Sequence, residues 1–147
     1  MSRIIGIDVG QKRTGLAVSD PLGIFASPIE TLPTAKIIDY LKNYALKEKL
    51  SAFVVGYPKN MDNTPSEAAK YVEEVISRLK KHFPEIPVIL EDERFTSKLA
   101  MRSLIDSGVK KMDRRDKAAV DKVSAALILQ TYLDRPANNK DESYLIS

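Results

Sequence analysis

The chain of 147 residues is 44% hydrophobic and 29% charged, which is typical of a globular protein long enough to bury a core. It contains no cysteine, so disulfides, thiolate metal sites and cysteine nucleophiles are excluded, and its one histidine excludes a cluster of histidine ligands. The net charge of +3 is compatible with a nucleic-acid partner but is too small to indicate one by itself.

The composition predicts one α/β domain over residues 1–135, followed by a polar C-terminal tail over residues 136–147. The first residues lead directly into an apolar, β-branched run, without the basic and apolar regions of a signal peptide. No apolar run approaches the ~20 residues that a membrane-spanning helix needs. We therefore expect a cytoplasmic protein.

The N-terminal region predicts two β-strands, over residues 4–9 and 14–19, joined by a tight polar turn. Asp8 lies inside the first strand, which is apolar on both sides of it and is therefore expected to be central and buried. A third strand is predicted over residues 24–32. Because the connections are short, we expect these three strands to form an antiparallel meander.

Helices and strands alternate in the rest of the chain. A helix capped by Thr34 precedes a buried strand over residues 52–56, and this helical crossover favours pairing parallel to the first strand. Thr64 and Glu67 form a capping box that starts the second helix. The remaining predictions are a strand over 87–90, a helix from 96 or 97 to 108, a charged connector over 109–117 and a helix over 118–133. This order predicts a mixed α/β sheet with helices on both faces.

Three carboxylates stand at positions where an acid is costly: Asp8, Glu93 and Asp121. Asp8 lies inside a central strand, Glu93 follows the fifth strand, and Asp121 lies near the start of the last helix. The helical face of Asp121 continues with a small and apolar stripe, which turns Asp121 towards the sheet: Ala125, Ile128 and Tyr132. A structural alternative exists for two of them. Asp8 could accept backbone N–H bonds from the turn that follows it, and Asp121 could favour the helix dipole.

The predicted topology can bring these acids together. Sites in open α/β sheets gather at the carboxyl ends of parallel strands, so Asp8 and Glu93 approach each other if the first and fifth strands run parallel. Converging carboxylates repel one another unless a cation holds them. Without cysteines, and with one histidine, the matching cation is a hard one, Mg²⁺ or Mn²⁺. Such ions suit phosphodiester cleavage, because they activate a water and stabilise the leaving oxygen.

Four groups of motifs follow one another along the chain. They are Gly6-Ile7-Asp8-Val9-Gly10 with Arg13-Thr14-Gly15, Val55-Gly56-Tyr57-Pro58 with Met61-Asp62-Asn63-Thr64, Asp92-Glu93-Arg94-Phe95-Thr96-Ser97, and Val120-Asp121 with Ser124-Ala125-Ala126 and Ile128-Leu129. No single motif is specific, because the first occurs in sugar kinases and actin-like ATPases as well. In this order, over residues 3–133, the series resembles the YqgF (RuvX) family.

The resemblance implies an RNase H-like fold, related to the RuvC Holliday-junction resolvases, with a five-stranded mixed sheet in the order 3-2-1-4-5. It implies a hydrolase, a nuclease proposed to process the 5′ end of pre-16S rRNA in the bacterial cytoplasm during ribosome biogenesis. By motif position, Asp8, Glu93 and Asp121 take the places of the catalytic, metal-binding carboxylates. RuvC-type enzymes carry a further acid on the last helix, where this chain has Ser124, so the number of metal ions stays open.

Basic residues are expected around the same edge of the sheet, where they would contact phosphates without reading sequence. The candidates are Lys12, Arg13, Lys59, Arg94, Lys110, Lys111, Arg114 and Arg115. The alternative for each is a solvated surface charge, and Arg94 could simply pair with a neighbouring acid.

Three alternatives remain open beside a nuclease that acts on an rRNA precursor. The same chemistry on a four-way DNA junction would favour a dimer with two sites facing one way, and the sequence allows a monomer or a homodimer. A non-catalytic RNA-binding or transcription-associated factor is favoured by the missing fourth acid. An ATP-binding module of the sugar-kinase type ranks last, because the chain is too short for two lobes that close over ATP.

Overall fold

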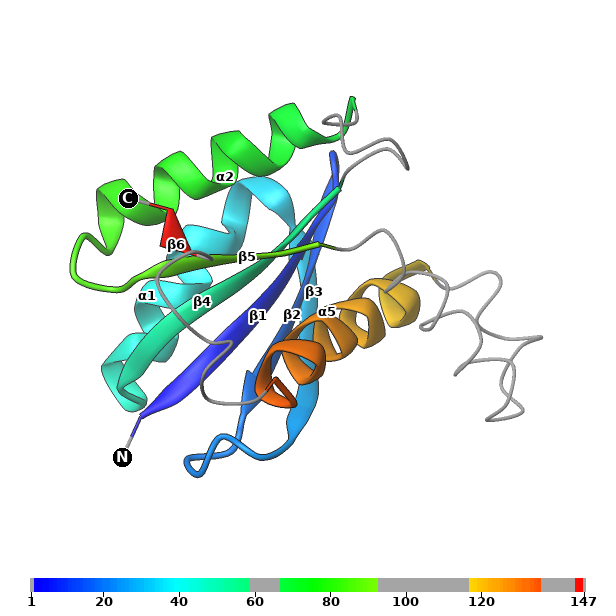
Figure 1. Ribbon diagram of the computed structural model, residues 1–147. Helices are drawn as coiled ribbons and strands as arrows, with labels where there is room; N and C mark the ends of the chain where they lie inside the picture. Colours follow the sequence, from blue (N-terminus) through cyan, green and yellow to red (C-terminus); the bar gives the residue numbers. More distant parts are fainter. Residues whose placement is uncertain (1, 59–66, 93–116, 136–144, 147) are drawn as a thin grey trace.

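A computed structural model describes residues 2–58, 67–92, 117–135 and 145–146 (Figure 1). The sheet contains six strands in the order β3-β2-β1-β4-β5-β6. Their bounds are β1 Arg3–Val9, β2 Arg13–Ser19, β3 Ala26–Pro33, β4 Leu50–Tyr57, β5 Val88–Asp92 and β6 Leu145–Ile146. The helices are the 3₁₀ helix η1 Thr34–Lys36, α1 Ile37–Lys47, α2 Ala69–His82 and α5 Lys117–Leu133. Within the described ranges, none of them has the length and apolarity needed to cross a membrane.

The strand pairing confirms the predicted topology. β1, β2 and β3 form an antiparallel meander, β4 pairs parallel to β1, and β5 pairs parallel to β4. The order 3-2-1-4-5 is therefore confirmed, and β6 extends it by pairing antiparallel to the outer edge of β5. This short strand was not predicted within the polar C-terminal tail. Two consecutive strand-forming residues, Leu145 and Ile146, lie within the polar tail and pair with the open edge that β5 offers.

Two hydrophobic cores lie on opposite faces of the sheet, as predicted. α1 and α2 cover one face, and α5 crosses the other over β1, β2 and β3 (Figure 1). The alternation along β1 divides its side chains between them. Ile5, Ile7 and Val9 belong to the core under α1 and α2, whereas Gly6 and Asp8 belong to the α5 face.

Two predicted helix starts were wrong. Thr34 does not cap α1, because its hydroxyl donates instead to the carbonyl of Gly10 at 2.8 Å and lies 2.9 Å from the hydroxyl of Thr14. These contacts fasten the start of η1 to the turn between β1 and β2. α2 begins at Ala69 without a side-chain cap, so it starts after the predicted capping box, of which Thr64 lies outside the described residues.

Candidate metal and nucleic-acid site

Asp8 is half-buried near the carboxyl end of β1 and faces α5. Its neighbour two residues earlier, Gly6, shows this orientation. A Cβ atom added to Gly6 would stand 2.7 Å from Cβ of Leu129 and 2.8 Å from the carbonyl oxygen of Ala125, both in α5. Because residues i and i+2 of a strand share a face, the side chain of Asp8 projects on the side that α5 covers.

Gly15 brings the first turns of α5 next to Asp8. It is the register partner of Asp8 across the β1–β2 pair, so their Cα atoms are about 5 Å apart and they share a face. A Cβ atom at Gly15 would stand 2.1 Å from the carbonyl oxygen of Asp121 and 2.8 Å from the amide nitrogen of Lys122. The backbone of Asp121 therefore rests on Gly15, beside the strand position that Asp8 occupies.

Arg13 adds a positive charge at the same place. Its Nε atom lies 3.6 Å from Oδ2 of Asp121, and the two side chains are 42% and 28% exposed, respectively. An ion pair so open to solvent contributes at most about 1 kcal/mol to stability. Arg13 therefore remains accessible to a ligand, and Asp121 is held at the edge of the sheet beside β1 and β2.

Glu91 is a buried acid on the same face that the sequence analysis did not single out. Its neighbour Ile89 belongs to the core under α5, so the alternation of β5 places Glu91 on that side. Its side chain is 2% exposed and is paired with Arg135, whose Nε donates to Oε2 at 3.1 Å and whose Nη2 donates to Oε1. Burial, and secondly the charge of Glu91, raise the pKa of the adjacent Tyr132. The period-2 pattern of β5 was the signal that could have identified Glu91.

The register of the parallel strands gives the separation between Asp8 and Glu91. Ile7 pairs with Val55, so continuing this register by one residue places Asp8 beside Gly56. Gly56 in turn pairs with Glu91. Two strand spacings, about 10 Å, therefore separate Asp8 from Glu91 across this edge.

Of the predicted site residues, Asp8, Asp121, Lys12 and Arg13 lie in described parts of the chain. Lys12 is exposed in the turn between β1 and β2, so the structure brings these four residues to one edge of the sheet. The others lie outside the described residues: Lys59, Glu93, Arg94, Lys110, Lys111, Arg114 and Arg115. Within the described ranges, no group of three or more acidic or histidine side chains is placed to hold a metal ion.

Two further residues have clear local roles. Ser124, at the position of the absent fourth acid, lies in α5 and is buried, with 5% of its surface exposed. Tyr57, at the end of β4, is 9% exposed, and its hydroxyl donates to Glu73 at 2.7 Å. That hydrogen bond is the main reason why the pKa of Tyr57 is raised. Because the ring is buried, Tyr57 does not offer a face on which a base could stack.

The fold of the protein is RNase H-like. RuvC from T. thermophilus, solved in complex with a Holliday junction substrate, superposes with a TM-score of 0.52. The likeness covers 87% of this chain and 92% of that one at 17% sequence identity, and it shows a shared fold.

The chain belongs to the RuvX family, whose model, described as Holliday junction resolvase, matches residues 2–135. A protein of Bacteroides thetaiotaomicron with the name "Putative pre-16S rRNA nuclease" is 49% identical over 134 residues, which cover 91% of this chain and 97% of that protein. A protein of the same name from Porphyromonas gingivalis is 48% identical over 136 residues and covers 92% of this chain and 99% of its own length.

Proposed function

We propose that this protein is a metal-dependent nuclease that hydrolyses phosphodiester bonds in the cytoplasm, during processing of the 5′ end of pre-16S rRNA. The observation that carries the proposal is the packing of the Asp121 backbone on Gly15, the register partner of Asp8, which places both acids at one edge of the sheet. Membership of the RuvX family and the names of relatives that are nearly half identical support the reaction and the substrate.

The donor set at this edge fits a hard cation. Asp8 and Asp121 supply carboxylate oxygens, and the chain has no cysteine to supply a thiolate. Glu93, which lies outside the described residues, would complete the set by its motif position in the sequence. When bound there, Mg²⁺ or Mn²⁺ would activate the attacking water and neutralise charge on the phosphate.

The protein's own basic side chains would position the substrate. Arg13 and Lys12 lie in and beside the turn after β1, where they can donate to phosphate oxygens that flank the scissile bond. We assign the same role to six residues outside the described ranges: Lys59, Arg94, Lys110, Lys111, Arg114 and Arg115. Such contacts fix the register of a strand without reading its sequence.

A four-way DNA junction is the second candidate substrate, because the family model that matches this chain is described as a Holliday junction resolvase. Cleavage of either substrate would require the same carboxylates, so loss of activity in an Asp8 variant does not show which substrate is the natural one. A resolvase cuts two strands symmetrically and would act as a homodimer, whereas one domain suffices to trim an RNA end.

The test compares two end-labelled substrates, an RNA that carries the 5′ leader of pre-16S rRNA and a four-way DNA junction. Each is incubated with Mg²⁺, Mn²⁺ or EDTA and with wild type, Asp8→Asn or Asp20→Asn. Asp20 is a suitable control, because it lies at the opposite end of the sheet and accepts hydrogen bonds from the backbone of Ile24 and Phe25, which asparagine can also accept.

We expect metal-dependent cleavage of the RNA that falls by more than about 100-fold in Asp8→Asn, beyond the 10- to 100-fold cost of losing an outer-shell partner. Asp20→Asn should cleave like wild type. Equal cleavage by wild type and Asp8→Asn would refute the assigned site. Metal-dependent cutting of the junction alone would establish the second substrate instead.

A further inference from the structure

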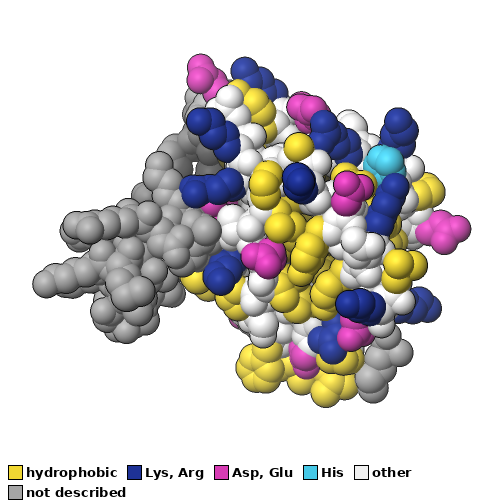
Figure 2. All heavy atoms as spheres, turned by 180° about the vertical axis from the view of Figure 1, so that it is seen from behind, with side chains coloured by type: hydrophobic (Ala, Val, Ile, Leu, Met, Phe, Trp, Pro, Cys, Tyr) yellow, Lys and Arg dark blue, Asp and Glu magenta, His cyan; other side chains and the backbone are white. Residues whose placement is uncertain are grey.

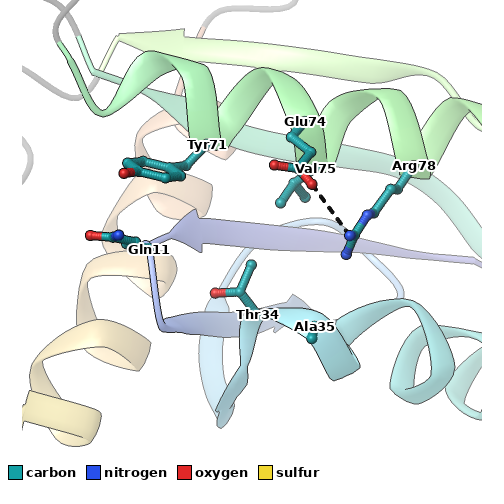
Figure 3. Close-up of a pocket in the computed structure, with 7 residues that line it drawn as sticks. All are labelled: Gln11, Thr34, Ala35, Tyr71, Glu74, Val75 and Arg78. Carbon is teal, nitrogen blue, oxygen red and sulfur yellow. Dashed lines mark hydrogen bonds and ion pairs between the residues drawn. The ribbon is translucent and has the colours of Figure 1, made fainter.

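A polar groove lies beside the proposed site, on the opposite face of the sheet. It consists of two adjoining hollows of about 170 and 390 Å³ between α2 and the turn after β1. Gln11 and Tyr71 line both hollows, and Figure 3 shows their side chains facing one another across the opening. We call this the Tyr71 groove. The proposed function makes no use of it.

The walls of the groove are fixed before any ligand binds. Thr34 holds η1 to the turn after β1, because its amide donates to the carbonyl of Lys12 at 2.9 Å and its hydroxyl donates to the carbonyl of Gly10. Val75, on the α2 side, is 2% exposed and anchors this wall in the core. A preformed pocket binds its ligand without the entropy cost of ordering loops first.

The lining of the groove has the chemistry that a nucleobase requires. Tyr71 offers a half-buried aromatic ring, and the ammonium of Lys70 lies 5.2 Å from the centre of that ring. The exposed amide of Gln11 can donate and accept. At the far side, Arg78 Nη2 donates to Glu74 Oε1 at 3.3 Å, so this pair also presents donors and acceptors together (Figure 3). An aromatic platform with a neighbouring cation is typical of proteins that bind single strands.

Over the described part of the α1 and α2 face, charges of one sign do not gather into a broad patch (Figure 2). Figure 2 shows Lys and Arg side chains interspersed with Asp and Glu side chains around an apolar centre, over the part of this face that the structure describes. Phosphates bind best where one sign of charge gathers. Among the described residues of this face, the Tyr71 groove is therefore a better candidate for recognition than the mixed charges around it (Figure 2).

The groove is also within reach of a strand bound at Asp8. Gln11 follows Asp8 by three residues, so their Cα atoms are at most about 10 Å apart. This distance corresponds to a few nucleotides along a strand. A backbone that passes Asp8, Lys12 and Arg13 at the end of the sheet can therefore place a flanking base on the α2 side.

We propose that the Tyr71 groove binds one base of single-stranded RNA, a few nucleotides from the scissile phosphate, by stacking it on Tyr71 and hydrogen-bonding its edge to Gln11 and the Glu74–Arg78 pair. The proposal rests on the proposed function, because it presumes that the strand crosses the edge at Asp8. It gives the protein a preference for unpaired over duplex RNA, since a paired base cannot enter the groove.

The test uses single-stranded RNA oligonucleotides that carry the fluorescent base 2-aminopurine at one position each, with EDTA present to prevent cleavage. Stacking on an aromatic ring quenches this base. Wild type should quench one position strongly, and the same sequence in a duplex should show no such quenching. Tyr71→Ala should lose the quenching and bind about 5- to 100-fold more weakly, the range for one stacked base. Tyr71→Phe, which keeps the ring, should behave like wild type.

The salt dependence of RNA binding distinguishes the loss of base stacking from the loss of a phosphate contact. Tyr71→Ala should leave the slope of affinity against salt unchanged, whereas Arg13→Ala should reduce it by about one. Ala35→Leu is a second variant. Ala35 is exposed and lines the same hollow, so the larger leucine side chain should obstruct the groove. This variant should also lose the quenching.

The outcomes distinguish failure of this inference from failure of the proposed function. If wild type cleaves RNA but Tyr71→Ala and Ala35→Leu bind and quench as wild type does, the groove has no such role and the nuclease assignment stands. If wild type neither binds nor cleaves single-stranded RNA, both the inference and the proposed function are overturned.

Discussion

At the scale of the residue, Gly15 matters as much as the acids do. Asp8 can approach Asp121 only because Gly15 has no side chain to hold α5 away from β2. The carbonyl oxygen that a Cβ atom would meet at 2.1 Å belongs to helix backbone, which cannot move aside as the end of a flexible side chain can. The whole first part of α5 would have to shift.

Gly15→Ala should therefore destabilise the protein by about 1–3 kcal/mol, the usual cost of overpacking, and should lower cleavage by separating Asp121 from Asp8. Chemical denaturation and the cleavage rate measure the two effects. Ser27→Ala, on the exposed surface of β3, is the control and should change neither. Wild-type stability and activity in Gly15→Ala would show that α5 does not rest on β2 as described.

The positions of Asp8 and Asp121 could be predicted from the sequence, because an acid inside an apolar strand and an acid above a buried helical stripe are both visible in the pattern. The stripe is confirmed, with Ala125 and Ile128 buried and Tyr132 partly buried. The contact of Gly15 with α5 was not predictable, because it depends on the position along β2 at which a helix distant in sequence crosses the strand. The roles of Asp8, Glu93, Asp121 and the predicted basic residues stay predictions.

At the scale of the element, α5 is fixed at both ends. Near its start, the backbone of Asp121 rests on Gly15, and just beyond its last turn Arg135 binds the buried Glu91 of β5. Such a buried pair adds little net stability over apolar residues of similar size, but removal of one partner leaves a charge buried alone. The pair therefore controls how the helix that carries Asp121 sits on the sheet.

Arg135→Met alone should lower the free energy of unfolding by about 3 kcal/mol, because Glu91 then lies buried without its partner. The double variant Arg135→Met with Glu91→Leu should recover most of this loss, because neither charge remains. Denaturant titration of the wild type, both single variants and the double variant gives the coupling energy. Additive losses in the double variant would contradict the account.

Element types were largely predictable from the sequence, whereas the starts of the first two helices and the short strand β6 were not. Periodicity identified β1 to β5, and the last helix was predicted within one residue at its start. Thr34 was misread because its hydroxyl binds the distant Gly10 carbonyl rather than the amides of its own helix. β6 was missed because two apolar residues give too short a pattern inside a polar segment.

At the scale of the whole molecule, one edge of the sheet joins two surfaces. The acids project on the face that α5 covers, and the Tyr71 groove opens on the face of α1 and α2. The net charge of +3 is modest, so affinity for a strand has to come from contacts gathered at this edge. We propose that Asp8 and Asp121 bind a divalent cation there.

Titration of Mn²⁺, followed by electron paramagnetic resonance of the free ion, tests this claim most directly, because it requires no knowledge of the substrate. Wild type should bind Mn²⁺, whereas Asp8→Asn and Asp121→Asn should each weaken binding by more than about tenfold, since each removes a charged oxygen ligand. Asp20→Asn should bind like wild type. Unchanged Mn²⁺ binding in both Asp8→Asn and Asp121→Asn would contradict the account and would leave these two acids with a structural role only.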